Sequence, residues 1–272
     1  FRYYNTYFGL PLVQDRAVLV PTAEEDPAIW LDAVEPYFRK PAGFIFLTPE
    51  EQSLVSRRAG HPLEPAVVIG AGLDPAPPPP DRTALDALGL PQDFVLYLGR
   101  IDRNKGCYTL FEYFEEHLRN GGDATLVLAG PATIPVPSHD RIRALGFVDE
   151  AVRDALLAHA RALIVPSPYE SLSIALLEGW NHGVPALVNG DCAPLAGQVR
   201  RAHGGLSYRS SRDFSVGLTW LLTHPDEARA VGRQGRAYVE REYRWPVVMS
   251  RVEALLAETL QRTRTGKTLT PR

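Results

Sequence analysis

The chain has 272 residues, enough for one large or two modest domains with a real hydrophobic core. Its 29 Lys and Arg residues against 32 Asp and Glu residues give a net charge of −3, which argues against broad nucleic-acid binding. Two cysteines, Cys107 and Cys192, exclude a disulfide framework and a cysteine-based zinc site, and they favour a reducing, cytoplasmic compartment.

The first third of the chain alternates short apolar runs with helical patterns. Runs that end in turn residues predict buried strands over residues 17–20, 44–47 and 66–69. Apolar spacing predicts a helix over 27–38, and acidic residues in a first turn predict another over 50–59. Three strands are too few for a complete doubly wound sheet, so we interpret this region as part of a domain.

A proline-rich segment over 74–81 follows, and its polyproline geometry suits a semi-rigid spacer at a domain boundary. The alternation then resumes, which predicts a doubly wound parallel sheet. The predicted strands are 94–98, 125–129, 143–145, 162–165 and 186–188, with helices over 105–119, 150–159, 172–181, 213–222, 226–242 and 245–260. Residues 263–272 are polar and basic without periodicity, so we expect a disordered tail.

Ligands of open α/β sheets bind beyond the carboxyl ends of the strands, and three loops there carry suggestive residues. In loop 99–106, glycine lets the backbone approach a ligand, and Arg100 and Lys105 place two cations at a helix N-terminus, an arrangement that suits phosphate. A solvated basic turn is the alternative. In loop 146–148, Phe147 could contact a base, although a place in the core is the simpler interpretation.

A third loop, 166–171, leads into the helix that contains Glu178. Ser171 is a plausible N-cap, which would leave the Leu172 and Ser173 amides available to a diphosphate. On a continuous helix, Glu170 and Glu178 would be roughly 12 Å apart and within about 80° around the axis, a span that fits a nucleotide sugar. The alternative is that Glu170 assists capping and Glu178 is a surface charge.

Four motifs occur in a fixed order: G-R-x(4)-K-G over 99–106, G-F-V over 146–148, P-S-x-x-E-S-L-x-x-x-L-L-E over 166–178, and H-G-V-P-A-L-V over 182–188. Together they resemble the donor-binding half of GT-B glycosyltransferases of glycosyltransferase family 4, over roughly residues 66–262. The resemblance implies a partial, acceptor-side Rossmann-like domain (1–75), a Rossmann-like donor domain (76–244) and a helix that returns toward the first domain (245–262).

The resemblance also implies roles for single residues. Arg100 and Lys105 would hold the donor diphosphate and stabilise charge on the leaving phosphate, and Glu170 would orient the sugar. These three are the expected catalytic residues. The expected substrate-binding residues are Gly99, Phe147, Val148, Ser171, Leu172 and Glu178, the last for ribose.

Family members transfer sugar with retention, so the resemblance implies hexosyl transfer from a nucleotide diphosphate sugar to a carbohydrate or another hydroxyl acceptor. No D-x-D sequence occurs, so we expect no metal and no cofactor. The sequence departs from the family at Gly179-Trp180 and lacks the early glycine-rich loop. A GT-B-like nucleotide-sugar epimerase and a non-catalytic nucleotide-sugar-binding module stay open as alternatives. The nucleotide base, the acceptor, the oligomeric state and peripheral membrane contact also stay open.

Overall fold

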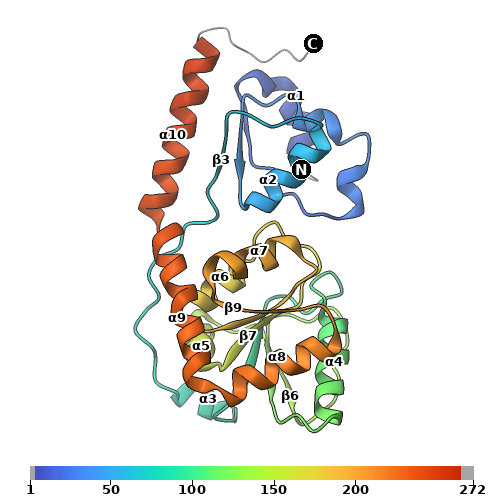
Figure 1. The fold of residues 1–272 in the computed structure, drawn as a ribbon, viewed down its shortest axis with the longest axis vertical. Helices are drawn as coiled ribbons and strands as arrows, with labels where there is room; N and C mark the ends of the chain where they lie inside the picture. Colours follow the sequence, from blue (N-terminus) through green and yellow to red (C-terminus); the bar gives the residue numbers. More distant parts are fainter. Residues whose placement is uncertain (1–3, 265–272) are drawn as a thin grey trace. The chain divides into compact units, whose positions relative to one another are not determined.

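Two separate parallel β-sheets organise the chain in the structure, a computed structural model that describes residues 4–264 (Figure 1). Contacts divide the chain into two compact units. The first extends to Asp74 and also contains Tyr169–Leu172 and the chain from Glu242. The second consists of Pro75–Pro168 and Ser173–Arg241. The predicted parallel α/β fold is therefore confirmed.

The first unit contains a three-stranded sheet in the order β1-β2-β3, as the three apolar runs predicted. The strands are β1 (Val18–Leu19), β2 (Gly43–Phe46) and β3 (Ala66–Val68). Buried side chains from the strands and from the segments between them, Ile29, Phe38, Phe46 and Val55 among them, form its core. Around the sheet lie η1 (Asn5–Gly9), α1 (Leu10–Val13), η2 (Gln14–Arg16) and α2 (Pro49–Ala59).

The helix predicted over residues 27–38 is wrong. The structure has two short 3₁₀ turns instead, η3 (Pro27–Trp30) and η4 (Glu35–Phe38). Pro36 explains the break, because a proline inside a helix lacks the N–H donor and its ring clashes with the preceding turn. The apolar spacing still reports burial, since Ile29, Val34 and Phe38 enter the core.

Helix α10 (Trp245–Arg264) packs on β2 and β3 within the first unit. A Cβ atom at Gly43 of β2 would lie 2.9 Å from Oγ1 of the buried Thr259, so the absence of a side chain at Gly43 allows this close approach. The helix extends four residues beyond the predicted end at 260. The first two residues of the predicted disordered tail are therefore helical, and residues 265–272 lie outside the described part of the chain.

The second unit is built on a six-stranded parallel sheet in the order β6-β5-β4-β7-β8-β9. Its strands are β4 (Val95–Leu98), β5 (Leu126–Ala129), β6 (Ile142–Gly146), β7 (Ala162–Val165), β8 (Ala186–Asn189) and β9 (Gly205–Tyr208). The helices are α3 (Thr83–Ala87), α4 (Cys107–Arg119), α5 (Glu150–His159), α6 (Ile174–Asn181), α7 (Ala193–Ala202), α8 (Ser211–Thr223) and α9 (Pro225–Glu242). The helices α4 and α8 contact each other and share one buried cluster with the strands (Figure 1).

Three elements of this unit, α3, α7 and β9, were not predicted. Helix α7 contains Pro194, which suggests a loop from sequence alone. Proline is nevertheless compatible with the first turn of a helix, where its missing N–H has no intrahelical partner. Strand β9 begins with glycine and is only partly buried, so it lacks the apolar run that marked the central strands.

The departure from the family pattern at Gly179-Trp180 has a packing explanation. A Cβ atom at Gly179 would lie 2.8 Å from Cδ2 of Leu163, so this glycine lets α6 pack closely on β7. Trp180 is fully buried and its indole N–H donates to the Gly204 carbonyl at 2.8 Å. A small residue followed by a large one thus fits the space beneath α6.

Candidate functional site

The carboxyl ends of parallel strands lie at one edge of the sheet, and backbone contacts draw the loops after β4, β5 and β6 together there. The Gly99 amide donates to the Ala129 carbonyl at 2.9 Å, and the Gly130 amide donates to the Gly146 carbonyl at 2.7 Å. A Cβ atom at Gly130 (φ +143°) would lie 2.0 Å from the Gly99 carbonyl oxygen. The loop that follows β4 can therefore approach its neighbour only because residue 130 is glycine.

The loop after β4 also meets the loop after β7. Gly106 caps the N-terminus of α4 with φ +75°, and a Cβ atom there would lie 2.3 Å from the Pro166 carbonyl oxygen. The Asn189 side-chain amide, at the end of β8, donates to the carbonyls of Pro166 and Ser167, each at 3.4 Å. Backbone contacts thus hold the first and third predicted loops side by side.

Within the loop after β4, a buried carboxylate organises the two predicted cations. Asp102 forms an ion pair with the Arg100 guanidinium, and its other oxygen accepts the Lys105 backbone N–H at 2.7 Å. The Tyr97 hydroxyl donates to the Arg100 carbonyl at 2.6 Å. The Arg100 side chain remains more than half exposed, at 57%. Sequence reasoning missed Asp102, although its position two residues after Arg100 in the loop is a signal for such a pairing.

Phe147 and Val148 follow β6 at the same edge. Phe147 is 84% exposed, so the interpretation of this ring as a core residue is wrong. Val148 is partly buried, and Asp149 caps α5 by accepting the Val152 amide at 2.8 Å. An exposed aromatic ring on a short, capped loop is available for stacking against a flat ligand.

Glu178 lies in α6 with its side chain three-quarters buried, opposite Arg153 of α5. The nearest atoms of the pair, Nη1 of Arg153 and Oε1 of Glu178, are 3.6 Å apart. Burial raises the pKa of the Glu178 carboxyl, the carboxylates of Asp154 and Glu150 act in the same direction, and Arg153 opposes them. Arg153 was missed from the sequence, because nothing in the spacing of the two residues indicates that they meet.

The predicted start of the helix over residues 172–181, which corresponds to α6, is wrong. Ser173, and not Ser171, caps α6: its side-chain oxygen accepts the Leu176 amide at 3.3 Å, and the helix begins at Ile174. Glu170, Ser171 and Leu172 are buried and precede the helix. The spacing calculated for Glu170 and Glu178 on one continuous helix therefore does not apply.

Residues 169–172 group with the first unit. The contacts of Thr48 and Glu51 in this unit were also missed from the sequence. Thr48 caps α2 by accepting the Glu51 amide at 3.1 Å, and its hydroxyl donates to the Ser171 carbonyl at 3.0 Å. The buried Glu51 carboxylate accepts the Leu47 and Ala23 amides at 2.6 and 2.7 Å. Glu51 thus joins the segments after β1 and β2, while Thr48 holds the segment that contains Glu170.

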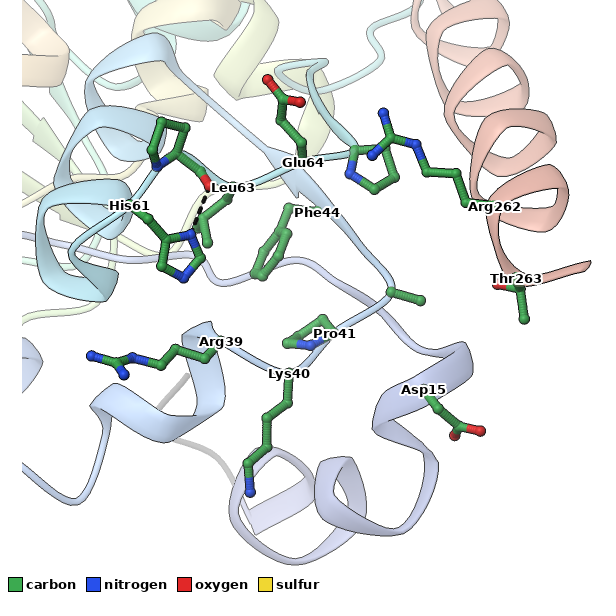
Figure 2. Close-up of a pocket in the computed structure, with 13 residues that line it drawn as sticks. Asp15, Arg39, Lys40, Pro41, Phe44, His61, Leu63, Glu64, Arg262 and Thr263 are labelled. Atoms are coloured by element: carbon green, nitrogen blue, oxygen red, sulfur yellow. Dashed lines mark hydrogen bonds between the residues drawn. The ribbon is translucent and has the colours of Figure 1, made fainter. Parts of the chain in front are cut away.

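Cavities also lie at the opposite, amino ends of the strands. In the first unit a cavity of about 90 Å³ is lined by residues that precede β2 and β3. Figure 2 shows that the charged ends of Asp15, Arg39, Lys40 and Glu64 point away from one another, so they do not converge on a ligand. In the second unit a cavity of about 350 Å³ is lined by residues that precede β4, β7 and β8.

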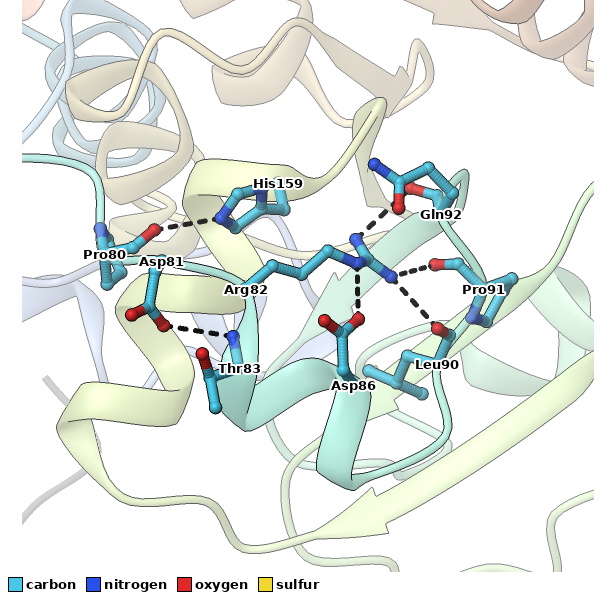
Figure 3. Close-up of polar contacts among 9 residues, drawn as sticks. All are labelled: Pro80, Asp81, Arg82, Thr83, Asp86, Leu90, Pro91, Gln92 and His159. Carbon is cyan, nitrogen blue, oxygen red and sulfur yellow. Dashed lines mark hydrogen bonds and ion pairs between the residues drawn. The ribbon is translucent and has the colours of Figure 1, made fainter.

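Arg82 borders the second cavity, but its donors serve the chain itself (Figure 3). Its guanidinium pairs with Asp86 at 2.9 Å and donates to the carbonyls of Leu90, Pro91 and Gln92. His159 contacts the Pro80 carbonyl at 3.0 Å. These contacts fix the end of the proline-rich segment to the second unit, and we assign Arg82 a structural role.

Other candidate chemistry is sparse over residues 4–264. Among them, no three His, Cys, Asp or Glu side chains gather in an arrangement that could hold a metal ion. Both cysteines are buried, and burial raises the pKa of the Cys107 thiol, which lowers its reactivity. A search of the same residues finds no helix with the length and apolar character needed to span a membrane.

Comparisons with known proteins agree with this architecture. Residues 92–224 match the family model described as glycosyl transferases group 1. Glycogen synthase of Mycobacterium tuberculosis is 27% identical over 165 residues, which cover 57% of this chain and 40% of that protein. The chain thus spans about two fifths of the length of the curated relatives it matches.

Solved structures extend the likeness to most of the chain. Sucrose-phosphate synthase of Thermosynechococcus elongatus has a TM-score of 0.74 at 20% identity, covering 97% of this chain and 72% of that one. HepE of Anabaena, solved with UDP, has a TM-score of 0.75 at 16% identity, covering 94% and 74%. Residues 92–224 are therefore similar in sequence to the group 1 glycosyl transferases, and the chain shares the fold of these two solved structures.

Proposed function

We propose that this chain binds the donor substrate of a glycosyltransferase that moves a hexosyl group from a nucleotide diphosphate sugar to a hydroxyl acceptor. The observation that carries the proposal is the contact between Gly106 and Pro166. It joins the loop that contains Arg100 and Lys105 to the start of the loop that contains Glu170. HepE, which shares the fold, has been solved with UDP and with UDP-glucose, which supports this class of donor.

Arg100 and Lys105 would bind the diphosphate and stabilise the charge that develops on it as the glycosidic bond breaks. Cations aimed at a developing charge lower the barrier more than cations that bind the ground state alone. Asp102 supports this role because its contacts with Arg100 and with the Lys105 amide restrict the conformations of the loop. Gly99 would let the backbone approach the phosphate.

Three further contacts complete the proposed donor site. Glu170 would accept hydrogen bonds from the sugar hydroxyls, Glu178 from the ribose hydroxyls, and Phe147 with Val148 would contact the base. The amides of Ser171 and Leu172 remain proposed phosphate contacts. Because α6 begins at Ile174, we add the amides of Ile174 and Ala175, which have no acceptor within the helix, whereas the Leu176 amide donates to the Ser173 side chain.

We further propose a metal-independent reaction with retention of anomeric configuration, in the cytoplasm. Metal independence is supported by the paired cations of the loop after β4 and by the lack of a D-x-D sequence. The buried thiols of Cys107 and Cys192, neither in a disulfide, are in line with a reducing compartment. Undiminished turnover in a chelator, and a product with the anomeric configuration of the donor, are the expected results.

Thermal unfolding with UDP, GDP, ADP and their sugar conjugates tests the donor site. A ligand at a hundred times its Kd adds about 2.7 kcal/mol, which raises Tm by roughly 5–10 °C in a chain of this size. Arg100→Ala and Glu178→Ala should lose that shift, and their unliganded Tm should fall by no more than a few degrees. Arg161→Met is the control, because it also removes an arginine side chain and Arg161 lies away from the proposed site, at the amino end of β7.

Release of free nucleotide from the stabilising sugar conjugate, followed with and without candidate acceptors, tests turnover. Binding without release or transfer would favour a non-catalytic module. If no nucleotide shifts the Tm of the wild-type protein at saturation, the proposed donor site is wrong.

A further inference from the structure

Arg153 occupies an unusual position among three carboxylates of the second unit. Its Nη1 atom is 3.6 Å from Glu178, and its Nη2 atom is 3.2 Å from Glu150 and 3.3 Å from Asp154. The side chain is 33% exposed, and its Nε atom is buried without a hydrogen-bond acceptor among the described residues. Arg153 therefore lies close to Glu178 while two carboxylates of its own helix fix its position.

The surroundings of Glu178 disfavour its ionised form, so a nearby cation is needed to stabilise the carboxylate. Burial raises the pKa of its carboxyl, and Asp154 and Glu150 raise it further. His182, at the end of α6, is 3.7 Å from Asp154, but burial lowers the pKa of its ring and Arg236 lowers it too. A mostly neutral His182 gives little help at neutral pH, so Arg153 provides the cation in contact with Glu178.

We propose that Arg153 is a positioning residue for ribose recognition: it holds one oxygen of Glu178 so that the carboxylate presents its other oxygen to the ribose hydroxyls. This inference rests on the proposed function, in which Glu178 binds ribose. The planar guanidinium makes this possible, because its Nη1 atom faces Glu178 at 3.6 Å while its Nη2 atom donates to the two α5 carboxylates. Arg153 thereby selects nucleotides that retain the 2′ and 3′ hydroxyls.

A merely structural ion pair makes different predictions. A partly exposed pair contributes little to stability, so its loss would lower Tm by only a few degrees. Loss of a purely structural pair would also weaken the binding of ribonucleotides and of dideoxynucleotides to the same extent. A positioning role affects only the ligands that carry the hydroxyls.

Calorimetric titration with UDP, GDP and ADP, and with the 2′,3′-dideoxy form of each, distinguishes the positioning role of Arg153 from a structural one, because it measures the affinity for each form. We expect the wild-type protein to prefer the hydroxylated form of its nucleotide at least tenfold, since hydrogen bonds to a charged group are strong. Arg153→Met should lose most of that preference and bind the dideoxy form as the wild type does. Arg153→Lys keeps the positive charge but lacks the planar guanidinium, so its preference for the hydroxylated nucleotide should lie between those of the wild type and Arg153→Met. Arg161→Met should behave as the wild type.

A pH series from 5 to 8 adds a readout that a structural role would not move. Binding of the hydroxylated nucleotide should weaken as the pH falls and Glu178 becomes protonated. Because Arg153→Met removes the opposing cation, the weakening should begin at a higher pH in that variant. If the wild-type protein binds nucleotide but Arg153→Met keeps the wild-type preference for the hydroxylated form and the wild-type pH midpoint, the inference is overturned and the proposed function stands. No nucleotide binding by the wild type overturns the proposed function and the inference with it.

Discussion

Replacing Gly106 by alanine tests the reasoning that close backbone packing assembles the candidate site. Gly106 has φ +75°, and its Cβ atom would lie 2.3 Å from the Pro166 carbonyl oxygen, a separation that real side chains do not adopt. The loop after β4 and the loop after β7 would have to move apart. The substitution should therefore reduce both stability and nucleotide binding.

The magnitude has two parts. A residue with a Cβ atom costs about 1–2 kcal/mol in the left-handed conformation, and overpacking a tight contact costs about 1–3 kcal/mol. Gly121 separates these parts, since it has φ +87° and no atom within 4 Å of its Cβ position. Gly121→Ala should lose only the first part, whereas Gly106→Ala should lose about 2–5 kcal/mol in total.

Urea unfolding of both variants measures the loss of stability, and titration with UDP or the preferred nucleotide measures the loss of binding. We expect Gly121→Ala to bind nucleotide as the wild type does and Gly106→Ala to bind at least tenfold more weakly. Equal stability of the two variants, or wild-type affinity in Gly106→Ala, would refute the view that this contact positions the two loops.

Three more outcomes are expected. Phe147→Ala should leave Tm unchanged, because the ring is 84% exposed, and should weaken nucleotide binding about five- to tenfold in calorimetry. Ser173→Ala should cost about 1 kcal/mol in urea unfolding, whereas Ser171→Ala should leave α6 intact, since only Ser173 caps it. Burial raises the pKa of Glu51 to about 7, above its value in the unfolded chain. Unfolding free energy should therefore fall, by on the order of 3 kcal/mol, as the pH rises from about 4.5 to 7, and Glu51→Gln should lose that contribution to the pH profile.

Sequence patterns predicted the central strands of both sheets well because those strands are buried on both faces. Strand β7 is an unbroken apolar run with every residue buried, and β5 has the same character. Edge strand β9 has a half-exposed pattern that carries no such signal. The accuracy of the prediction thus follows burial more closely than it follows position in the chain.

The start of α6 shows where local patterns fail. Ser171 and Ser173 are both good capping residues and lie two positions apart, so propensity cannot choose between them. The choice depends on contacts that the segment makes elsewhere: the Ser171 carbonyl accepts the Thr48 hydroxyl, from a residue 123 positions earlier in the chain. An error of two residues in a helix start was enough to invalidate the calculated distance between Glu170 and Glu178.

Local sequence patterns also fail to identify the partners of charged residues. From the sequence, Arg100 could be a solvated cation and Glu178 a surface carboxylate, and neither Asp102 nor Arg153 was assigned a partner. In the folded chain two of the predicted ligand-binding charges have an opposite charge beside them, Asp102 for Arg100 and Arg153 for Glu178. A ligand that binds either residue must share it with that partner, because the partner already satisfies part of its hydrogen-bonding capacity. The proposed donor site therefore assigns the strength of donor binding to these two neighbours as much as to the residues that the motifs identify.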